Sequence, residues 1–183
     1  MKKIIFLLFA LVLFINVNSQ EKYLTKTGHI WFLSNTPLEK IEAHNKAVVS
    51  LLNLTTGDIE FVLLMKSFKF DNALMEEHFN ENYVQSDQFP KATFKGKITN
   101  LSSIQLESGQ PQQVTIEGNL TIHGKTNTVK TNGTLAKSGD KIDGKSKFNL
   151  SPSDYDMKVE KYLEEKIAKT VEVNIELSYD KQK

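Results

Sequence analysis

The chain has 183 residues, a formal net charge of +1, no cysteine, and 23 basic residues that are all lysine. The absence of arginine, together with the near-zero charge, argues against a nucleic-acid partner, because Arg is the usual bidentate ligand of phosphate. Without cysteine there is no disulfide and no N-terminal Cys through which a lipoprotein is tethered. A chain of this length fits one domain.

Residues 1–19 have the layout of a secretory signal peptide. Lys2 and Lys3 form a positive n-region, Ile4 to Ile15 is an unbroken apolar run, and Ser19 is a small residue before a cleavage point at Gln20. The apolar run is too short for a spanning helix, which needs roughly 20 residues. We therefore expect export to the periplasm or beyond the cell, no stable membrane span, and a mature domain at 20–183; the alternative is a retained N-terminal anchor.

Strand-like segments dominate the mature chain. Short apolar runs at 30–33 and 47–54 precede a long β-type segment at 59–70, and clean alternation follows at 91–98, 114–122, 129–135, 142–150 and 171–179. Turn residues separate several of these segments, and short strands at such regular spacing indicate an all-β sandwich or barrel.

One helix is expected among the strands. Asp71 or Asn72 can cap the segment DNALMEEHFNENY (71–83), which has apolar residues at helical spacing. A second, shorter helical piece is expected at about 159–165.

The four alternating segments between 91 and 150 each carry a glycine on their apolar face. Their other face is rich in lysine and must meet water, because an outward Lys in a transmembrane barrel costs ~2–4 kcal/mol. The glycines either bend the strands so that a barrel can close, or leave a cavity for an apolar guest, since an empty cavity costs roughly 24 cal/mol per Å³. The two roles are compatible, because a barrel of about eight strands can hold one small ligand.

This apolar face predicts the residues that line the lumen and bind a ligand. In the segment 59–70 the pattern allows two parities, and the one with Phe61 and Leu63 is preferred because Glu60 and Lys66 share the other. The predicted lining consists of Phe61, Leu63, Phe94, Gly96, Ile98, Ile116, Gly118, Leu120, Val129, Gly133, Leu135, Gly144 and Phe148.

Histidines offer the remaining candidate polar groups. His78 and Phe79 are candidate gate residues at the mouth of the barrel. His123, at the end of its strand before Gly124, is either a polar group at the mouth or a turn residue whose ring bonds to nearby backbone. The histidine and acidic spacings predict no metal site.

Catalytic motifs are not found in the sequence. There is no Gly-x-Ser-x-Gly elbow, no phosphate-binding glycine loop and no Cys nucleophile. The inner face offers only Thr131 and Ser146 as polar groups, so we expect no enzymatic activity.

Two motifs resemble the YceI-like family of lipid- and polyisoprenoid-binding proteins. The first is HFNENYVQSDQFPKATFKG (78–96), with its Phe-Pro-Lys-Ala-Thr-Phe strand. The second is GNLTIHGKTNTV (118–129), which keeps the family's glycine, leucine, threonine and valine positions at Gly118, Leu120, Thr121, Gly124, Thr126 and Val129. The resemblance implies an extended, antiparallel, lipocalin-like β-barrel of about eight strands over residues 20–183, with one short helix near the mouth.

The resemblance also implies a function. We expect an exported protein that sequesters or carries a hydrophobic small molecule, such as a polyisoprenoid, an isoprenoid quinone or a fatty-acid-like lipid, and needs no other cofactor. The alternative is a non-enzymatic protein-interaction or stress-related scaffold with a filled barrel. The sequence leaves a homodimer open.

Overall fold

The computed structural model describes residues 21–182, so the signal-peptide prediction for residues 1–19 lies outside the described part. Nine strands make up most of the fold: β1 (Lys22–Asn35), β2 (Lys40–Asn53), β3 (Asp58–Leu64), β4 (Lys69–Phe70), β5 (Lys91–Ile98), β6 (Gln112–Ile122), β7 (Lys125–Ser138), β8 (Lys141–Leu150) and β9 (Val171–Lys181). Helix α1 (Ala73–His78) continues into a wider π-helical turn at Phe79–Tyr83. Short 3-10 turns occupy Met65–Ser67, Leu101–Ser103, Leu106–Ser108, Pro152–Tyr155 and Lys161–Leu163.

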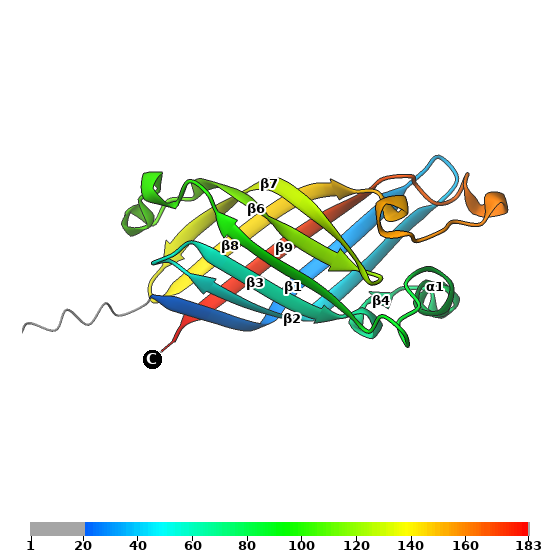
Figure 1. The fold of residues 1–183 in the computed structure, drawn as a ribbon, viewed down its shortest axis with the longest axis horizontal. Coiled ribbons are helices and arrows are strands. Elements are labelled where there is room, and N and C mark those ends of the chain that lie inside the picture. Colours follow the sequence, from blue (N-terminus) through cyan, green and yellow to red (C-terminus); the bar gives the residue numbers. More distant parts are fainter. Residues whose placement is uncertain (1–20, 183) are drawn as a thin grey trace, which may run out of the picture.

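The strands close into an elongated antiparallel barrel (Figure 1). Its order is β1-β9-β8-β7-β6-β5-β3-β2, and β2 pairs back onto β1 to complete eight strands. The two-residue strand β4 pairs only with Ala43 and His44 of β2. The predicted antiparallel barrel of about eight strands, with one short helix, is therefore confirmed.

The wall of the barrel is incomplete at the end where α1 lies. Strands β2 and β3 pair only between Val49–Leu52 and Ile59–Val62, and β7 pairs with β8 only from Gly133 onward. Beyond these points the strands continue without a shared ladder. The segment after β3 pairs with β2 at Ala43 and His44 instead, and the turn at Pro152–Tyr155 is bonded to Asn127 of β7. At one end of the barrel all neighbouring strands are thus paired. At the other end β2 separates from β3, and β7 separates from β8.

Most predicted strands are present, but the segment 59–70 is not one strand. The chain leaves β3 after Leu64, makes the 3-10 turn Met65–Ser67 and re-enters the sheet as β4. Met65 and Phe68 are both buried, and residues three apart on a strand would face opposite sides. The turn allows both side chains to point inward. The prediction of one continuous strand was wrong for this reason.

The helical predictions are partly correct. Asn72, not Asp71, caps α1, because its side-chain oxygen accepts hydrogen bonds from the backbone N–H groups of Leu74 and Met75. The second helical piece is reduced to the 3-10 turn at Lys161–Leu163.

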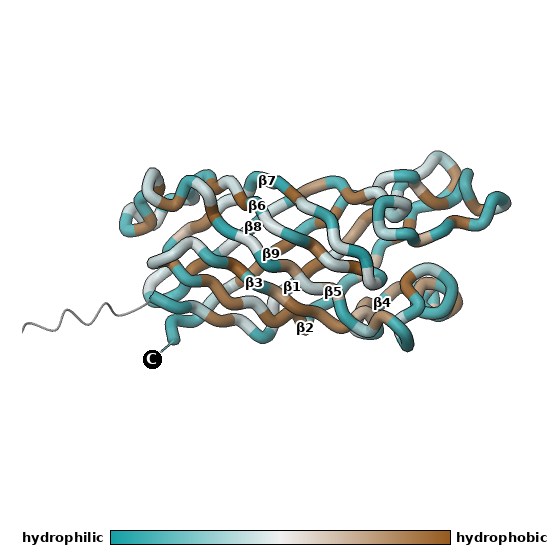
Figure 2. The backbone as a smooth tube through the Cα atoms, in the orientation of Figure 1, coloured by the Kyte–Doolittle hydropathy of each residue, from teal (hydrophilic) through white to brown (hydrophobic). Residues whose placement is uncertain are grey.

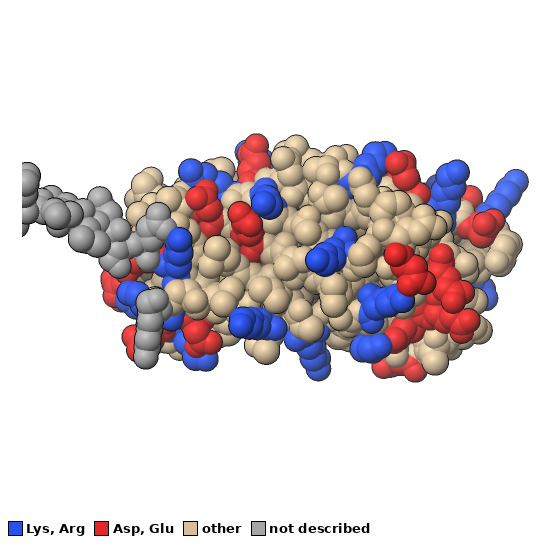
Figure 3. Space-filling model, turned by 60° about the horizontal axis from the view of Figure 1, so that its bottom comes forward, with Lys and Arg blue, Asp and Glu red and all other residues tan. Residues whose placement is uncertain are grey.

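Apolar and polar residues alternate along the strands, so the tube in Figure 2 changes between brown and teal residue by residue. The outward residues form cross-strand ion pairs such as Lys145–Glu176 and Lys147–Glu172, both at 2.9 Å. Figure 3 shows lysines and acidic residues interspersed over one face of the molecule, with acidic side chains gathered at the α1 end. Within the described residues, no helix is both long and apolar enough to cross a membrane.

Candidate binding cavity

A cavity of about 360 Å³ lies inside the barrel at the α1 end, where the wall is opened. Its lining is overwhelmingly apolar and comes from nearly every part of the fold. The apolar lining residues are Ile30, Phe32, Ile41, Phe61, Leu63, Met65, Phe68, Phe70, Leu74, Met75, Phe79, Val84, Ala92, Leu120, Ile122, Phe148, Leu150, Pro152, Met157, Val159, Leu163, Ile167, Val171, Val173 and Ile175.

Strand parity explains how the sequence builds this lining. Ile30 and Phe32 of β1 share a face, as do Leu120 and Ile122 of β6, and alternate residues of each strand point inward. In β3 the inward set is Phe61 and Leu63, whereas Leu64 on the other face is 49% exposed. The structure therefore selects the preferred parity of this segment.

An aromatic cluster fixes α1 over the mouth of the cavity. The ring of Phe79 lies 5.6 Å from Phe32, 5.7 Å from Phe68 and 5.1 Å from Phe70, measured between centroids. Aromatic pairs at such distances stabilise packing beyond simple burial. Phe79 thus anchors the helix, while the neighbouring His78 is exposed at the rim of the cavity.

The polar groups of the cavity belong to the segments around its mouth. They are Glu39 beside the β1–β2 turn, Asn72 and His78 of the helix, Tyr83 after it, Lys166 of the 151–170 segment, and Ser34 at the end of β1. Burial raises the pKa of the Tyr83 hydroxyl above its ordinary value, and the nearby Tyr162 and Glu160 add to the shift. The helix and the 151–170 segment therefore approach each other across the mouth.

The segment 151–170 covers the mouth and is attached to the barrel at several points. Ser34 Oγ, which is buried, accepts a hydrogen bond of 2.9 Å from the backbone N–H of Ala168. Asn127 Nδ2 donates to the Asp154 carbonyl at 2.7 Å, and Lys125 pairs with Asp156 at 2.9 Å.

His123 belongs to this attachment and not to the cavity lining. Its Nδ1 lies 3.0 Å from the Tyr155 carbonyl and its Nε2 lies 3.2 Å from Gln85 Oε1. Its own backbone has φ of +51° and Gly124 has +73°, which is the two-residue turn that matches the twist of a hairpin. The expectation of a ring bonded to nearby backbone was therefore wrong, because both ring partners are distant in sequence and the ring connects the hairpin to residues 85 and 155.

A second, smaller cavity of about 50 Å³ lies deeper in the barrel. It is lined by Ile59, Phe94, Ile116, Val129, Leu135, Gly144, Leu177 and Tyr179, among others. Phe61, Leu120, Phe148 and Ile175 line both cavities and hence stand between them.

Between the two inner-face glycines of β5 and β6 there is no free space. A Cβ on Gly96 would lie 2.5 Å from Phe94 Cζ, and one on Gly118 would lie 2.7 Å from the same atom. The Phe94 ring therefore fills the volume that the two glycines leave. Their missing side chains allow the close approach of β5 and β6 and do not widen the main cavity.

Comparison with known proteins identifies the fold family. A YceI-like domain model matches residues 23–179. The chain belongs to the YceI-like family.

Solved structures of other proteins share the fold at low sequence identity. A polyisoprenoid binding domain from Saccharophagus degradans, implicated in plant cell wall breakdown, is 16% identical with a TM-score of 0.77, covering 90% of this chain and 100% of the other. BcnA of Burkholderia cenocepacia is 17% identical with a TM-score of 0.71, covering 82% and 95%. A YCEI protein of Campylobacter jejuni is 16% identical with a TM-score of 0.55, covering 75% and 81%. No curated protein matches the chain significantly.

The predicted lining residues of this YceI-like chain fall into three groups. Phe61, Leu63, Leu120 and Phe148, with His78 and Phe79, line the main cavity. Phe94, Ile116, Val129, Leu135 and Gly144 line the inner cavity. The remaining four, which line neither cavity, are Gly96, Ile98, Gly118 and Gly133.

Several lining residues were missed by the sequence analysis. Ile30 and Phe32 of β1, and Val171, Val173 and Ile175 of β9, alternate in predicted strands, so parity could have found them. Phe68 and Phe70 follow the 3-10 turn Met65–Ser67, which breaks the parity of the expected strand 59–70. The residues of the 151–170 segment reach the cavity from irregular chain, where no period indicates which side faces inward.

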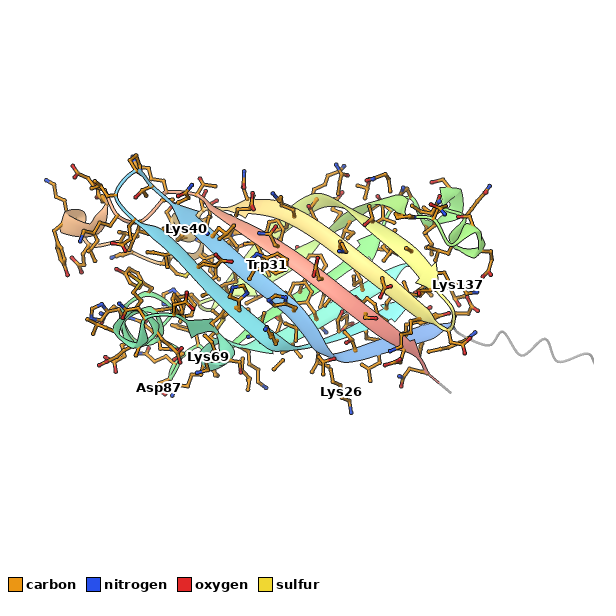
Figure 4. All side chains as sticks on the ribbon, turned by 180° about the vertical axis from the view of Figure 1, so that it is seen from behind. Lys26, Trp31, Lys40, Lys69, Asp87 and Lys137 are labelled. Carbon is orange, nitrogen blue, oxygen red and sulfur yellow. The ribbon has the colours of Figure 1, made fainter. Side chains whose placement is uncertain are left out.

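A histidine pair lies on the outer face of the barrel, across the wall from Ile30 and Phe32, which line the cavity. His29 Nε2 and His44 Nδ1 are 2.9 Å apart, and both rings stack with Trp31. Trp31 itself lies on the outer face of β1 (Figure 4). Burial and the neighbouring His44 lower the pKa of His29. Within the described residues, no three His, Asp or Glu side chains are placed to hold a metal ion.

Proposed function

We propose that this YceI-like chain is an exported, non-enzymatic binding protein that sequesters or carries a hydrophobic chain in the barrel. The chain would be a polyisoprenoid, an isoprenoid quinone or a fatty-acid-like lipid. One observation carries the proposal: a cavity of about 360 Å³ that is apolar throughout the barrel and has its polar groups around the mouth.

The energetics favour an occupant. Cavity formation costs roughly 24 cal/mol per Å³, which for this volume is about 9 kcal/mol relative to a filled core. A domain is stable by only about 5–15 kcal/mol, so a chain selected for stability alone would fill the space. A hydrocarbon guest recovers ~0.8 kcal/mol for each buried CH₂.

The cavity chemistry supports binding without a reaction. Thr131 and Ser146, the polar residues of the predicted inner face, lie 3.4 Å apart and bond to the backbone between β7 and β8, away from the main cavity. No nucleophile is placed beside a general base in the main cavity among the described residues.

Export is part of the proposal and is supported by the charged, apolar and small-residue regions of residues 1–19. Mass spectrometry of the protein from the extracytoplasmic fraction should give an N-terminus at Gln20. A mature protein that retains residues 1–19 would instead support a membrane anchor.

The filled-scaffold alternative is favoured by one observation: the Phe94 ring fills the space that Gly96 and Gly118 leave in the inner half of the barrel. Mass spectrometry of an organic extract of the purified chain separates the two functions. A carrier releases a stoichiometric lipid, whereas a scaffold releases none and does not bind added lipid.

A matched pair of variants connects the bound lipid to the cavity. Ala92 is buried and lines the main cavity, whereas Thr93 next to it points outward. Ala92→Phe should fill the cavity and abolish lipid release, and Thr93→Phe should leave it unchanged. Equal lipid release from both folded variants would contradict binding in this cavity.

A further inference from the structure

Four side chains end the main cavity inside the barrel. Phe61 of β3, Leu120 of β6, Phe148 of β8 and Ile175 of β9 line both the main and the inner cavity. They come from four different strands around the barrel, so together they form a cross-wall, which we call the floor.

Neighbouring residues hold the floor in place. Phe61 stacks on Phe94 with centroids 5.2 Å apart and an angle of 15° between the rings. Phe94 cannot retreat, because its ring tip already fills the space over Gly96 and Gly118. Leu120 and Ile175 are themselves buried. A guest chain that reaches the floor would have to displace packed side chains on several strands at once.

The size of the cavity limits what fits above the floor. A water-sized group occupies about 30 Å³. A cavity of about 360 Å³ therefore holds about a dozen such groups. The inner cavity, at about 50 Å³, adds only about two more.

The distribution of polar groups sets the direction of entry. The ionisable lining residues at the mouth are Glu39, His78 and Lys166, and all three lie on segments that surround the mouth of the cavity. The floor, in contrast, is wholly apolar. A polar headgroup at the floor would lose its hydration without partners, at a cost of a few kcal/mol. An amphiphile therefore enters tail first and leaves its head at the mouth.

We propose that the cavity is closed at the floor and selects single-chain, polar-headed lipids whose tail is about a dozen carbons long. This inference rests on the proposed function and adds the size of the ligand. Acyl and prenyl chains share this chemistry, and the test uses both.

The test measures binding against chain length with the delipidated protein. Saturated fatty acids of about 8 to about 20 carbons, and separately geraniol, farnesol and geranylgeraniol, displace anilinonaphthalene sulfonate from the cavity. Until the tail is long enough to reach the floor, each added carbon should tighten binding about fourfold, which corresponds to ~0.8 kcal/mol. Affinity should stop rising at about a dozen acyl carbons, and farnesol should bind more tightly than geranylgeraniol.

Two leucines provide a matched pair of variants. Leu120 belongs to the floor, and Leu177 lines only the inner cavity; both are buried. Leu120→Ala should join the two cavities and move the acyl optimum upward by about two to four carbons. Leu177→Ala should enlarge the inner cavity and leave the optimum unchanged. If Leu120→Ala does not fold, Phe148→Leu opens the same wall with a smaller change.

The outcomes separate this inference from the proposed function. Affinity that keeps rising beyond about 16 acyl carbons, or equal shifts in the Leu120 and Leu177 variants, would overturn the floor while leaving a lipid carrier. Failure of every chain to bind would overturn both. A sharp optimum that moves only in the floor variants supports the closed cavity.

Discussion

Gly96 of β5 and Gly118 of β6 face each other across the ladder, so close that neither position has room for a Cβ. Besides the Phe94 ring, an added Cβ on Gly96 would meet the Glu117 carbonyl oxygen at 2.6 Å, and one on Gly118 would meet the Lys95 carbonyl oxygen at 2.5 Å. Contacts with backbone cannot be relieved by a change of rotamer. The pair therefore permits the tight approach of β5 and β6 in the inner half of the barrel.

Gly118→Ala should destabilise the protein by at least about 1–3 kcal/mol, the usual cost of overpacking. Urea unfolding measures the loss. Gly144→Ala is the matched control, because its Cβ would meet only the flexible Leu135 Cδ2 at 3.2 Å and Tyr179 Cε2 at 3.6 Å among close neighbours. Equal stability of Gly118→Ala and Gly144→Ala would contradict the close-approach role.

The buried hydroxyl of Tyr179 predicts a loss of stability at alkaline pH. Tyr179 is fully buried and its Oη lies 2.9 Å from Ser50 Oγ. Burial raises the Tyr179 pKa well above its ordinary value, and the Ser50 hydrogen bond offsets only part of the shift. Above pH ~10 the unfolded chain loses this proton while the folded chain keeps it, so the free energy of unfolding falls as pH rises, by up to about 1.4 kcal/mol per unit.

Urea unfolding of wild type and Tyr179→Phe between pH ~8 and ~11 measures this effect. The variant should be less stable by about 1 kcal/mol at neutral pH, because it loses the hydrogen bond with Ser50. Its stability should then decline less steeply at high pH. Parallel pH profiles for the two proteins would show that Tyr179 does not titrate differently on folding.

Parity predicted much of the barrel and part of its cavity. Phe61, Leu63, Leu120 and Phe148 line the main cavity because alternate residues of a strand share a face, a rule that depends only on local geometry. The family motifs at 78–96 and 118–129 then indicated how the strands close into a barrel.

Features that depend on contacts between strands were beyond this reasoning. The volume left by Gly96 and Gly118 is filled because the register places them opposite each other and directs the Phe94 ring over both. The openings between β2 and β3 and between β7 and β8 likewise depend on pairing. Strand parity in a single sequence gives neither the register between strands nor the rotamer of a side chain such as Phe94. Parity therefore located the lumen but not its wider end.

The hydrogen bond between Ser34 and Ala168 should slow ligand exchange. Ser34→Ala leaves the Ala168 N–H without its acceptor, which weakens the covering segment by about 1 kcal/mol, or about fivefold in its opening equilibrium. Stopped-flow release of a bound fluorescent fatty acid should therefore be several times faster. Ser138→Ala, an exposed position at the opposite end of β7 from the turn at His123, is the control. Identical release rates in Ser34→Ala and wild type would show that this segment does not control exit.

The ring of His123 should stabilise the turn at Pro152–Tyr155. His123→Ala removes the contacts with the Tyr155 carbonyl and with Gln85 Oε1, so we expect faster amide hydrogen exchange over residues 152–157 and a loss of about 1–2 kcal/mol in unfolding free energy. His123→Asn tests the contribution of the ring apart from that of the backbone conformation. Asn tolerates the positive φ of this position, but its side chain is shorter than that of His. Both variants should lose protection at 152–157, with His123→Asn retaining more global stability. Wild-type exchange in His123→Asn would show that the ring is not needed to hold this turn, and that Asn127 and Lys125, which also bond to it, are sufficient.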